Sequence, residues 1–220
     1  MRESGARDVA ALILAAGASS RMPGTTKLLR PWGDGVVVDA VISAARRSDL
    51  GPIHVVVGAA GARLRRHLQD SDVVTVSHDE WRRGPPSSLG AGLAALGRSE
   101  DARAVVVLLG DEPGIREETI RATVSTWRAS GAGLLRARYR DRPGHPVLLI
   151  REAWAMAIEA VTTPDDSRSN WERLSSLGLE ACEVPVDGLS PVDVDDPAAL
   201  ARARARTLRR EPRQPGPERR

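Results

Sequence analysis

Only one of the 32 lysine and arginine residues in this sequence is a lysine, and it lies in a loop of small residues. Lys27 comes ten residues after Gly17, in the segment that follows the apolar run Val9 to Leu14. A compact ammonium on a flexible stem suits a phosphate better than a planar guanidinium does. Gly17 would let a ligand approach the backbone, so the amides of residues 16 to 20, with Arg21 and Lys27, could bind a polyphosphate. A chance lysine in an ordinary turn is the alternative.

A carboxylate stands at the end of a strongly apolar run. Asp111 follows the run Ala104 to Leu109 through Gly110, and Pro113 stiffens the next turn. Mg²⁺ usually takes only one or two protein carboxylates and completes its shell with water and substrate phosphate, so Asp111 is a candidate ligand. The alternative is that Asp111 only caps a helix that begins near Arg116.

Three more acids precede a late helical stretch. Asp193 and Asp195 are two residues apart, so their side chains share one side if the segment is extended. Either of them could complete a Mg²⁺ site with Asp111. Asp196 stands directly before Pro197 and is better explained as a helix N-cap.

His145 lies at the entrance to an expected strand, in the segment Arg142-Pro-Gly-His-Pro146. A structural hydrogen bond explains it as well as a role as a catalytic base does. The other histidines lack a metal-binding spacing. A single cysteine, Cys182, excludes an intrachain disulfide and a multi-thiolate metal site, and we expect it in the core.

Short β-branched runs alternate with amphipathic stretches, which is typical of a mostly parallel sheet covered by helices on both faces. The expected strands are 9–14, 53–57, 73–76, 104–109, 134–139, 146–150 and 179–184. The expected helices are 38–47, 61–68, 87–96, 117–129, 152–161, 170–177 and 197–206. Ligands of open α/β sheets lie outside the carboxyl ends of the strands, so the loops after Leu14, Val57, Val76 and Leu109 should line one rim.

The positive charge is concentrated at the end of the sequence. Residues 201–220 hold eight arginines and two glutamates, a net +6, so the total of +3 leaves −3 for residues 1–200. We expect one domain over residues 1–206 and a basic, disordered tail over residues 207–220. With no Phe and one Tyr, stacking platforms for single strands are scarce, and nucleic acid is not an expected partner. Without a signal stretch or an 18-residue apolar segment, we expect a soluble, cytoplasmic protein with no membrane contact.

Five ordered motifs between about Val9 and Leu200 make the sequence similar to a known family. They are Leu14-Ala-Ala-Gly-x-Ser-x-Arg-Met with Lys27-Leu-Leu29, Gly84-x-x-Ser-Ser-Leu-x-Ala-Gly-Leu93, Gly110-Asp-x-Pro113, Gly144-His-Pro-Val147 and Asp193-Val-Asp-Asp-Pro197. Together they resemble the molybdenum cofactor cytidylyltransferases, which belong to the wider group of nucleotidyltransferases similar to the molybdopterin guanylyltransferase.

The resemblance implies a Rossmann-like, three-layer α/β nucleotidyltransferase fold that binds a nucleoside triphosphate, CTP above all, and Mg²⁺. A phosphate on an acceptor such as the molybdenum cofactor would attack the α-phosphorus, and pyrophosphate would leave. Asp111 would hold the metal with Asp195 or Asp193, and His145 would lie on the acceptor side. Arg21, Lys27 and Asp111 would be the catalytic residues. The nucleotide would be bound by Leu14, Ala15, Ala16, Gly17, Ser19, Arg21, Lys27, His78, Ser87 and Ser88. Such transfers depend mainly on positioning and charge stabilisation.

Departures from the family pattern affect the substrate more than the chemistry. The first motif is one residue longer than usual, and Glu112 replaces the usual Gln or Met. His78 lies near a family Asn, Pro85-Pro86 replace Met-Ser, and the Gly-Asp-x-Gly-Ala-Arg segment survives only faintly around residues 165–168. These last three changes fall where base and acceptor should bind, so nucleotidyl transfer is more firmly indicated than cytidine or molybdopterin.

Other hypotheses therefore stay open. The chain could use another base, such as GTP, or another acceptor, such as a sugar phosphate. It could be a nucleotide-sugar glycosyltransferase with Asp193 and Asp195 as a metal clasp, although their late position argues against this. It could also be a cofactor-binding or insertion chaperone that has lost transfer. Whether the chain is a transferase or a chaperone, the basic tail could dock an acidic partner, such as an oxidoreductase that receives the cofactor.

Overall fold

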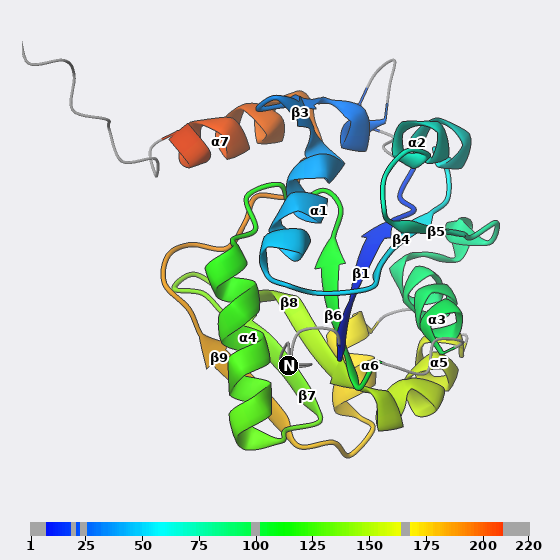
Figure 1. Cartoon of the computed structure of the whole chain (residues 1–220), viewed down its shortest axis with the longest axis vertical. Coiled ribbons are helices and arrows are strands. Elements are labelled where there is room, and N and C mark those ends of the chain that lie inside the picture. Colours follow the sequence, from blue (N-terminus) through cyan, green and yellow to red (C-terminus); the bar gives the residue numbers. More distant parts are fainter. Residues whose placement is uncertain (1–7, 19–20, 23–25, 98–101, 164–167, 209–220) are drawn as a thin grey trace, which may run out of the picture.

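The apolar runs of the sequence form one seven-stranded sheet with the strand order β5-β4-β1-β6-β8-β7-β9 (Figure 1). The computed structural model describes residues 8–18, 21–22, 26–97, 102–163 and 168–208 of the chain. Strand β8 is antiparallel to its neighbours β6 and β7, and the other neighbouring pairs are parallel. The strands are β1 (Val9–Ala15), β4 (Ile53–Val57), β5 (Val74–Ser77), β6 (Ala104–Leu109), β7 (Leu134–Arg138), β8 (Pro143–Ile150) and β9 (Ala181–Pro185).

Helices cover both faces of the sheet, which is why β1 is apolar along its whole length. Ala11 and Ile13 of β1 face one core cluster, whereas Leu12 and Leu14 face the other. The first cluster is closed by α1 (Val37–Arg47), α2 (Gly61–Leu68), α4 (Glu117–Ser130) and α7 (Pro197–Leu208). The second is closed by α3 (Pro85–Leu96), α5 (Trp154–Thr162) and α6 (Asn170–Ser175). The expected three-layer α/β architecture is therefore confirmed.

The structure adds short elements that the sequence pattern did not predict. A two-stranded ribbon pairs β2 (Pro31–Trp32) with β3 (Gly35–Val36), and three 3-10 turns occur at η1 (Lys27–Leu29), η2 (Trp81–Arg83) and η3 (Arg151–Ala153). Elements of two or three residues are too short to leave a periodic pattern.

Strand β8 begins at Pro143 and not at Pro146 as expected. Gly144 pairs with Ala137, and Pro143 pairs with Arg138, beyond a register shift in the β7–β8 ladder. His145 therefore lies inside a strand. Strand β9, in contrast, starts two residues later than its apolar run.

Helix α7 continues to Leu208, and residues 209–220 of the expected tail lie outside the described residues. No helix of the described part is long and apolar enough to span a bilayer.

Candidate active site

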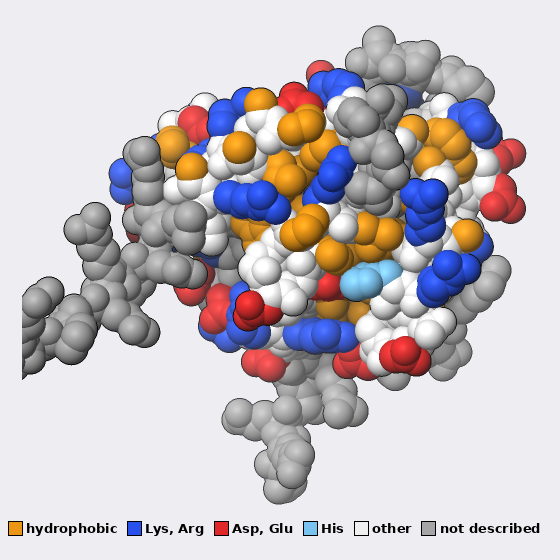
Figure 2. All heavy atoms as spheres, turned by 90° about the horizontal axis from the view of Figure 1, so that it is seen from above, with side chains coloured by type: hydrophobic (Ala, Val, Ile, Leu, Met, Phe, Trp, Pro, Cys, Tyr) orange, Lys and Arg blue, Asp and Glu red, His pale blue; other side chains and the backbone are white. Residues whose placement is uncertain are grey.

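A cleft of about 1170 Å³ opens where the parallel strands β1, β5 and β6 end. Because β8 runs the opposite way, its first residues reach the same rim. The cleft is lined by Gly17, Lys27, Ser87, Asp111 and His145, among others. Figure 2 looks down on this end of the molecule, where basic side chains are interspersed with apolar ones. The loops expected after Leu14, Val76 and Leu109 therefore line the cleft, and the start of β8 adds a further wall. The loop after Val57 was expected there too, but none of its residues lines this cleft; Ala59 and Ala60 line a separate pocket.

The loop after β1 leaves the core at Gly17. Residues 14–16 are buried, whereas Gly17 is exposed. A Cβ on Gly17 would meet no atom within 4 Å among the described residues, so a ligand could approach its backbone. Gly58 lets the next loop come close, because a Cβ there would lie 2.7 Å from the Ala16 carbonyl oxygen. Ser19, an expected nucleotide ligand, lies outside the described residues.

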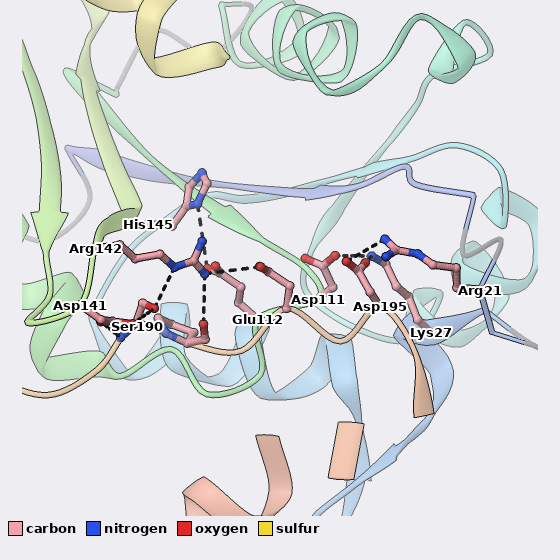
Figure 3. A network of polar contacts seen from close by, with 11 residues as sticks. Arg21, Lys27, Asp111, Glu112, Asp141, Arg142, His145, Ser190 and Asp195 are labelled. Atoms are coloured by element: carbon pink, nitrogen blue, oxygen red, sulfur yellow. Dashed lines mark hydrogen bonds and ion pairs between the residues drawn. The ribbon is translucent and has the colours of Figure 1, made fainter. Parts of the chain in front are cut away.

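Lys27 joins two carboxylates that are distant in sequence. Its Nζ contacts Asp111 Oδ2 and lies 2.8 Å from Asp195 Oδ1. The second oxygen of Asp195, Oδ2, lies 2.9 Å from Arg21 Nη2. Lys27 and Asp111 are 12% and 19% exposed, whereas Arg21 is 67% exposed. Arg21, Asp195, Lys27 and Asp111 thus form a row of alternating charges, called the Lys27 network below (Figure 3).

Burial and charge act in opposite directions within this network. Burial raises the pKa of Asp111, and the Lys27 ammonium counteracts that rise. Burial alone would lower the pKa of Lys27, but Asp111 and Asp195 more than offset it and raise that pKa above its ordinary value. The hydrogen bond from Lys27 holds the pKa of Asp195 below its usual range. Lys27 is therefore a protonated ammonium at neutral pH.

The segment before α7 places Asp195 next to Asp111. Val194 is fully buried, and its backbone N–H donates to the Asp111 carbonyl oxygen at 2.9 Å. Asp196 Oδ1 accepts from Ala199 N at 2.7 Å, which confirms the expected helix cap. Asp111 does not cap α4, because the N-cap of that helix is Arg116.

Asp193 has different partners from Asp195. Its Oδ2 lies 3.4 Å from Arg142 Nη2, and its charge acts on the carboxyl of Glu112. The charge of Asp193 also acts on Asp111 and helps to raise the pKa of that carboxyl. Of the two acids, Asp195 is the one that joins Lys27 and Asp111.

A buried Glu112 and a partly buried His145 form a pair on the other side of Asp111. His145 Nδ1 lies 4.0 Å from Glu112 Oε2, and this oxygen has no hydrogen-bond partner among the described residues. Burial raises the pKa of Glu112 well above its usual range, and Asp193 raises it further. Burial lowers the pKa of His145 to about 4. These shifts favour a neutral imidazole beside a protonated carboxyl.

Arg142 ties the β7–β8 turn to the segment that presents Asp195. Its Nε donates to Ser190 Oγ at 2.9 Å, and its Nη2 donates to the Pro191 carbonyl oxygen at 3.4 Å. Asp141 accepts from both the backbone N–H and the hydroxyl of Ser190 at 2.8 Å. Sequence reasoning missed this clamp because Arg142 and Ser190 are 48 residues apart. The only available signal was the position of Arg142 at the head of the His145 motif.

Of the residues expected near the base, Ser87 and Ser88 line the cleft, whereas His78 contacts Ser87 from behind the lining. His78 Nε2 is 2.9 Å from Ser87 Oγ, and that hydroxyl donates to the Gly84 carbonyl oxygen at 2.9 Å. Gly84 has a φ of 92°, a conformation that favours glycine and turns the chain into α3. Ser88 is buried and lines the cleft.

Arg136 and Trp171 form a further wall of the cleft that the sequence analysis did not predict. The Arg136 guanidinium lies 4.0 Å from the centre of the Trp171 ring, and both residues line the cleft. Arg136 also pairs with Glu183 on the neighbouring strand. The contact joins β7 to α6, and no local pattern in the sequence marks it.

The Lys27 network fits a divalent cation. Asp111 Oδ2 and Asp195 Oδ1 both contact the Lys27 ammonium, so these two carboxylates lie close enough together that they could hold an ion. Carboxylate oxygens are hard donors that suit Mg²⁺ or Mn²⁺. Within the described residues no cluster of three or more His, Cys, Asp or Glu could hold an ion, so water and phosphate would complete the shell.

The fold is an open α/β sheet with a cleft at the carboxyl ends of its parallel strands, which is where proteins of this class bind their ligands. Residues 11–177 match the MobA-like NTP transferase domain, and the chain belongs to that family. It thus contains a nucleotidyltransferase domain, as the sequence motifs predicted. The match is to the wider group and does not single out the molybdenum cofactor cytidylyltransferases.

Curated relatives of the chain carry the name bifunctional protein GlmU. The protein from Geobacter sulfurreducens is 35% identical over 171 residues, which cover 75% of this chain and 35% of the relative. The protein from Streptomyces coelicolor is 30% identical over 178 residues, which cover 79% of this chain and 36% of the relative. The chain therefore spans about a third of the length of these relatives.

Solved structures resemble the chain over nearly its whole length. The crystal structure of Rv0371c from Mycobacterium tuberculosis has a TM-score of 0.78 and 27% identity, covering 90% of this chain and 97% of that one. A crystal structure of the same protein in complex with manganese has a TM-score of 0.74 and 25% identity, covering 90% and 98%. These neighbours agree with the expected Rossmann-like nucleotidyltransferase fold.

Proposed function

We propose that this chain transfers a nucleoside monophosphate, with CMP from CTP as the leading choice, onto the phosphate of an acceptor such as the molybdenum cofactor. Mg²⁺ is the proposed metal, and pyrophosphate is the second product. The choice of CTP and of this acceptor rests on the resemblance of the five ordered motifs to the molybdenum cofactor cytidylyltransferases. We propose that the protein acts in the cytoplasm.

The observation that carries the proposal is the Lys27 network at the rim of the cleft. It gathers two cations and two carboxylates beside the loop that ends β1. Nucleotidyl transfer requires this combination, because charge on the triphosphate must be neutralised while a metal is held by oxygen ligands. We propose Asp111 and Asp195 as the metal ligands, with Asp193 as the alternative partner. The manganese complex of the M. tuberculosis neighbour supports a divalent cation.

The reaction needs no nucleophile from the protein. An oxygen of the acceptor phosphate forms a bond to the α-phosphorus, while the bond from that phosphorus to the bridging oxygen breaks. Pyrophosphate leaves with the electron pair. A divalent cation, when bound, supplies charge neutralisation at the phosphates. Lys27 and Arg21 bind the anionic oxygens, and the loop over residues 15–18 positions the triphosphate. Ser19 is proposed as a further ligand, and His78, Ser87 and Ser88 are proposed to contact the base or sugar.

The acceptor is proposed to bind on the His145 side of the cleft. Arg142 and Arg136 supply positive charge there, and Trp171 supplies an aromatic wall. A neutral His145 could hold the acceptor through a hydrogen bond. An oxidoreductase that receives the finished cofactor remains a proposed partner of the basic C-terminal residues.

A thermal-shift series with CTP, GTP, ATP and UTP, each with Mg²⁺, tests the choice of base. A triphosphate at about 100 times its Kd should stabilise the fold by roughly 2.7 kcal/mol. The largest shift is expected with CTP. A larger shift with another triphosphate would reject cytidine and keep nucleotidyl transfer.

The altered acceptor-side segments favour one second candidate, a cofactor-binding or insertion chaperone. It predicts tight binding of the molybdenum cofactor but no pyrophosphate from any triphosphate. Formation of a nucleotide-cofactor adduct, detected by mass spectrometry, would reject it.

A further inference from the structure

Lys27 is proposed to bind triphosphate, yet its ammonium is bonded to the carboxylates that would hold the metal. Nζ contacts Asp111 Oδ2 and Asp195 Oδ1 at the same time. Mg²⁺ binds oxygen at about 2.0–2.1 Å, so an ion that took both oxygens would overlap the position of Nζ. The ammonium and a metal ion therefore exclude each other between these two carboxylates.

We propose that Lys27 is an exchangeable counter-ion, which holds the two metal-binding carboxylates when the site is empty and moves to the phosphates when a metal-triphosphate complex arrives. This inference rests on the proposed function, because it takes Asp111 and Asp195 as the metal ligands. It adds a binding order to that function: metal bound with nucleotide is favoured, and metal alone is disfavoured.

The charge balance of the Lys27 network explains the order. Two cations and two carboxylates give the empty network a net charge of zero. A divalent ion alone would have to displace an ammonium from a mostly buried ion pair and would leave two positive charges uncompensated. A triphosphate brings several negative charges, which take up both the metal and the released ammonium. Metal and triphosphate should therefore raise each other's affinity by the same factor.

The network also contains the means to keep Asp195 in place during the exchange. Arg21 binds Oδ2 of Asp195, whereas Lys27 binds Oδ1. When Lys27 leaves, Arg21 can still hold the carboxylate from the other oxygen. The side chain of Lys27 is suited to the movement because it is a point charge on a long, flexible stem. An arginine would be held by its planar fork, which gives a physical reason for the only lysine of the sequence to stand here.

Titration with Mn²⁺ in the absence of nucleotide tests the exchange, with free Mn²⁺ measured by electron paramagnetic resonance. Removing the competing ammonium in Lys27→Met should tighten Mn²⁺ binding by about tenfold or more. Arg46→Met is the matched control, because it removes one cation from an exposed ion pair with Asp72 outside the cleft. It should bind Mn²⁺ as the wild type does.

A second variant keeps the test decisive. The double variant Lys27→Met with Asp195→Asn should lose the higher Mn²⁺ affinity of Lys27→Met, since Mn²⁺ is expected to bind between the carboxylates of Asp111 and Asp195. Lys27→Met should also be stabilised by Mn²⁺ in thermal unfolding more than the wild type is, which reports on the site even if the variant is less stable. Unchanged Mn²⁺ affinity in Lys27→Met, or a gain that survives Asp195→Asn, would overturn the exchange.

The exchange and the proposed function can fail separately. If the wild type releases pyrophosphate and Lys27→Met gains no Mn²⁺ affinity, the exchange is wrong and the function stands. If Lys27→Met gains affinity and the wild type transfers no nucleotide, the exchange stands as a property of the two carboxylates.

Discussion

Asp111 connects the metal side of the cleft to the acceptor side. Its carboxylate contacts Lys27, and the next residue, Glu112, faces His145. Burial raises the pKa of this carboxyl, and the paired Lys27 ammonium opposes that rise. The chemistry proposed for both sides of the cleft therefore depends on Asp111.

Asp111→Asn should lower pyrophosphate release by about 10²–10³-fold, because it removes an electrostatic stabiliser of the transition state while conserving shape. The rate is measured in a coupled pyrophosphate assay, with circular dichroism to confirm the fold. Asp72→Asn is the control, since Asp72 is a largely exposed carboxylate paired with Arg46. Equal rates for Asp111→Asn and the control would remove Asp111 from the mechanism.

His145 should make the stability of the fold depend on pH. The folded state keeps this imidazole neutral down to about pH 4, whereas its ordinary pKa is 6.5. The unfolded chain therefore binds more protons between these values, and the stability is full above pH 6.5 and falls as the pH drops toward 4. The loss should be on the order of 2 kcal/mol, since one pKa unit corresponds to about 1.4 kcal/mol and the side chain, 24% exposed, is partly screened.

Urea unfolding at pH 4.5 and 6.5 measures this loss. Glu112 acts in the opposite sense, because the pKa of its carboxyl is raised in the folded state. Its contribution to the free energy of unfolding is therefore lost as the pH rises above 4.5, the ordinary pKa of a glutamate. The informative quantity is therefore the difference between the wild type and His145→Gln, which should be less sensitive to acid. An identical pH dependence in the two proteins would show that His145 titrates normally.

At the level of secondary structure, hydrophobic periodicity predicted the long elements well. The runs Ile53–Val57, Gly61–Leu68 and Ala104–Leu109 begin and end where the sequence placed them. Periodicity failed at Pro143, because a strand that starts with Pro-Gly-His has no apolar alternation and is defined only by pairing with β7.

Gly92 allows helix α3 to lie close against β1. A Cβ at this position would lie 2.5 Å from Leu12 Cδ1 in a fully buried contact. Gly92→Ala should therefore destabilise the fold by about 1–3 kcal/mol through overpacking. Gly97→Ala at the end of the same helix is the control, since its nearest neighbour would lie at an ordinary 3.5 Å. Both are measured by urea midpoints at constant m-value, and equal midpoints would show that α3 can move away from the sheet.

At the scale of the whole molecule, topology explains which parts of the site could be predicted. The parallel order of β1, β5 and β6 brings their following loops to one rim, so Gly17, Ser87 and Asp111 could be placed together from the sequence. The contact of Lys27 with Asp195 spans 168 residues and depends on how the segment before α7 crosses that rim. No local rule gives that crossing, so the sequence alone could not say which of Asp193 and Asp195 contacts Lys27.

Pyrophosphate release from CTP, measured with Mg²⁺ and purified molybdenum cofactor, shows whether this chain transfers a nucleotide to that cofactor. We expect one pyrophosphate for each nucleotide-cofactor adduct formed, and loss of both products in Asp111→Asn. No release of pyrophosphate with CTP, GTP, ATP or UTP, from a folded protein that binds the cofactor, would contradict this transfer.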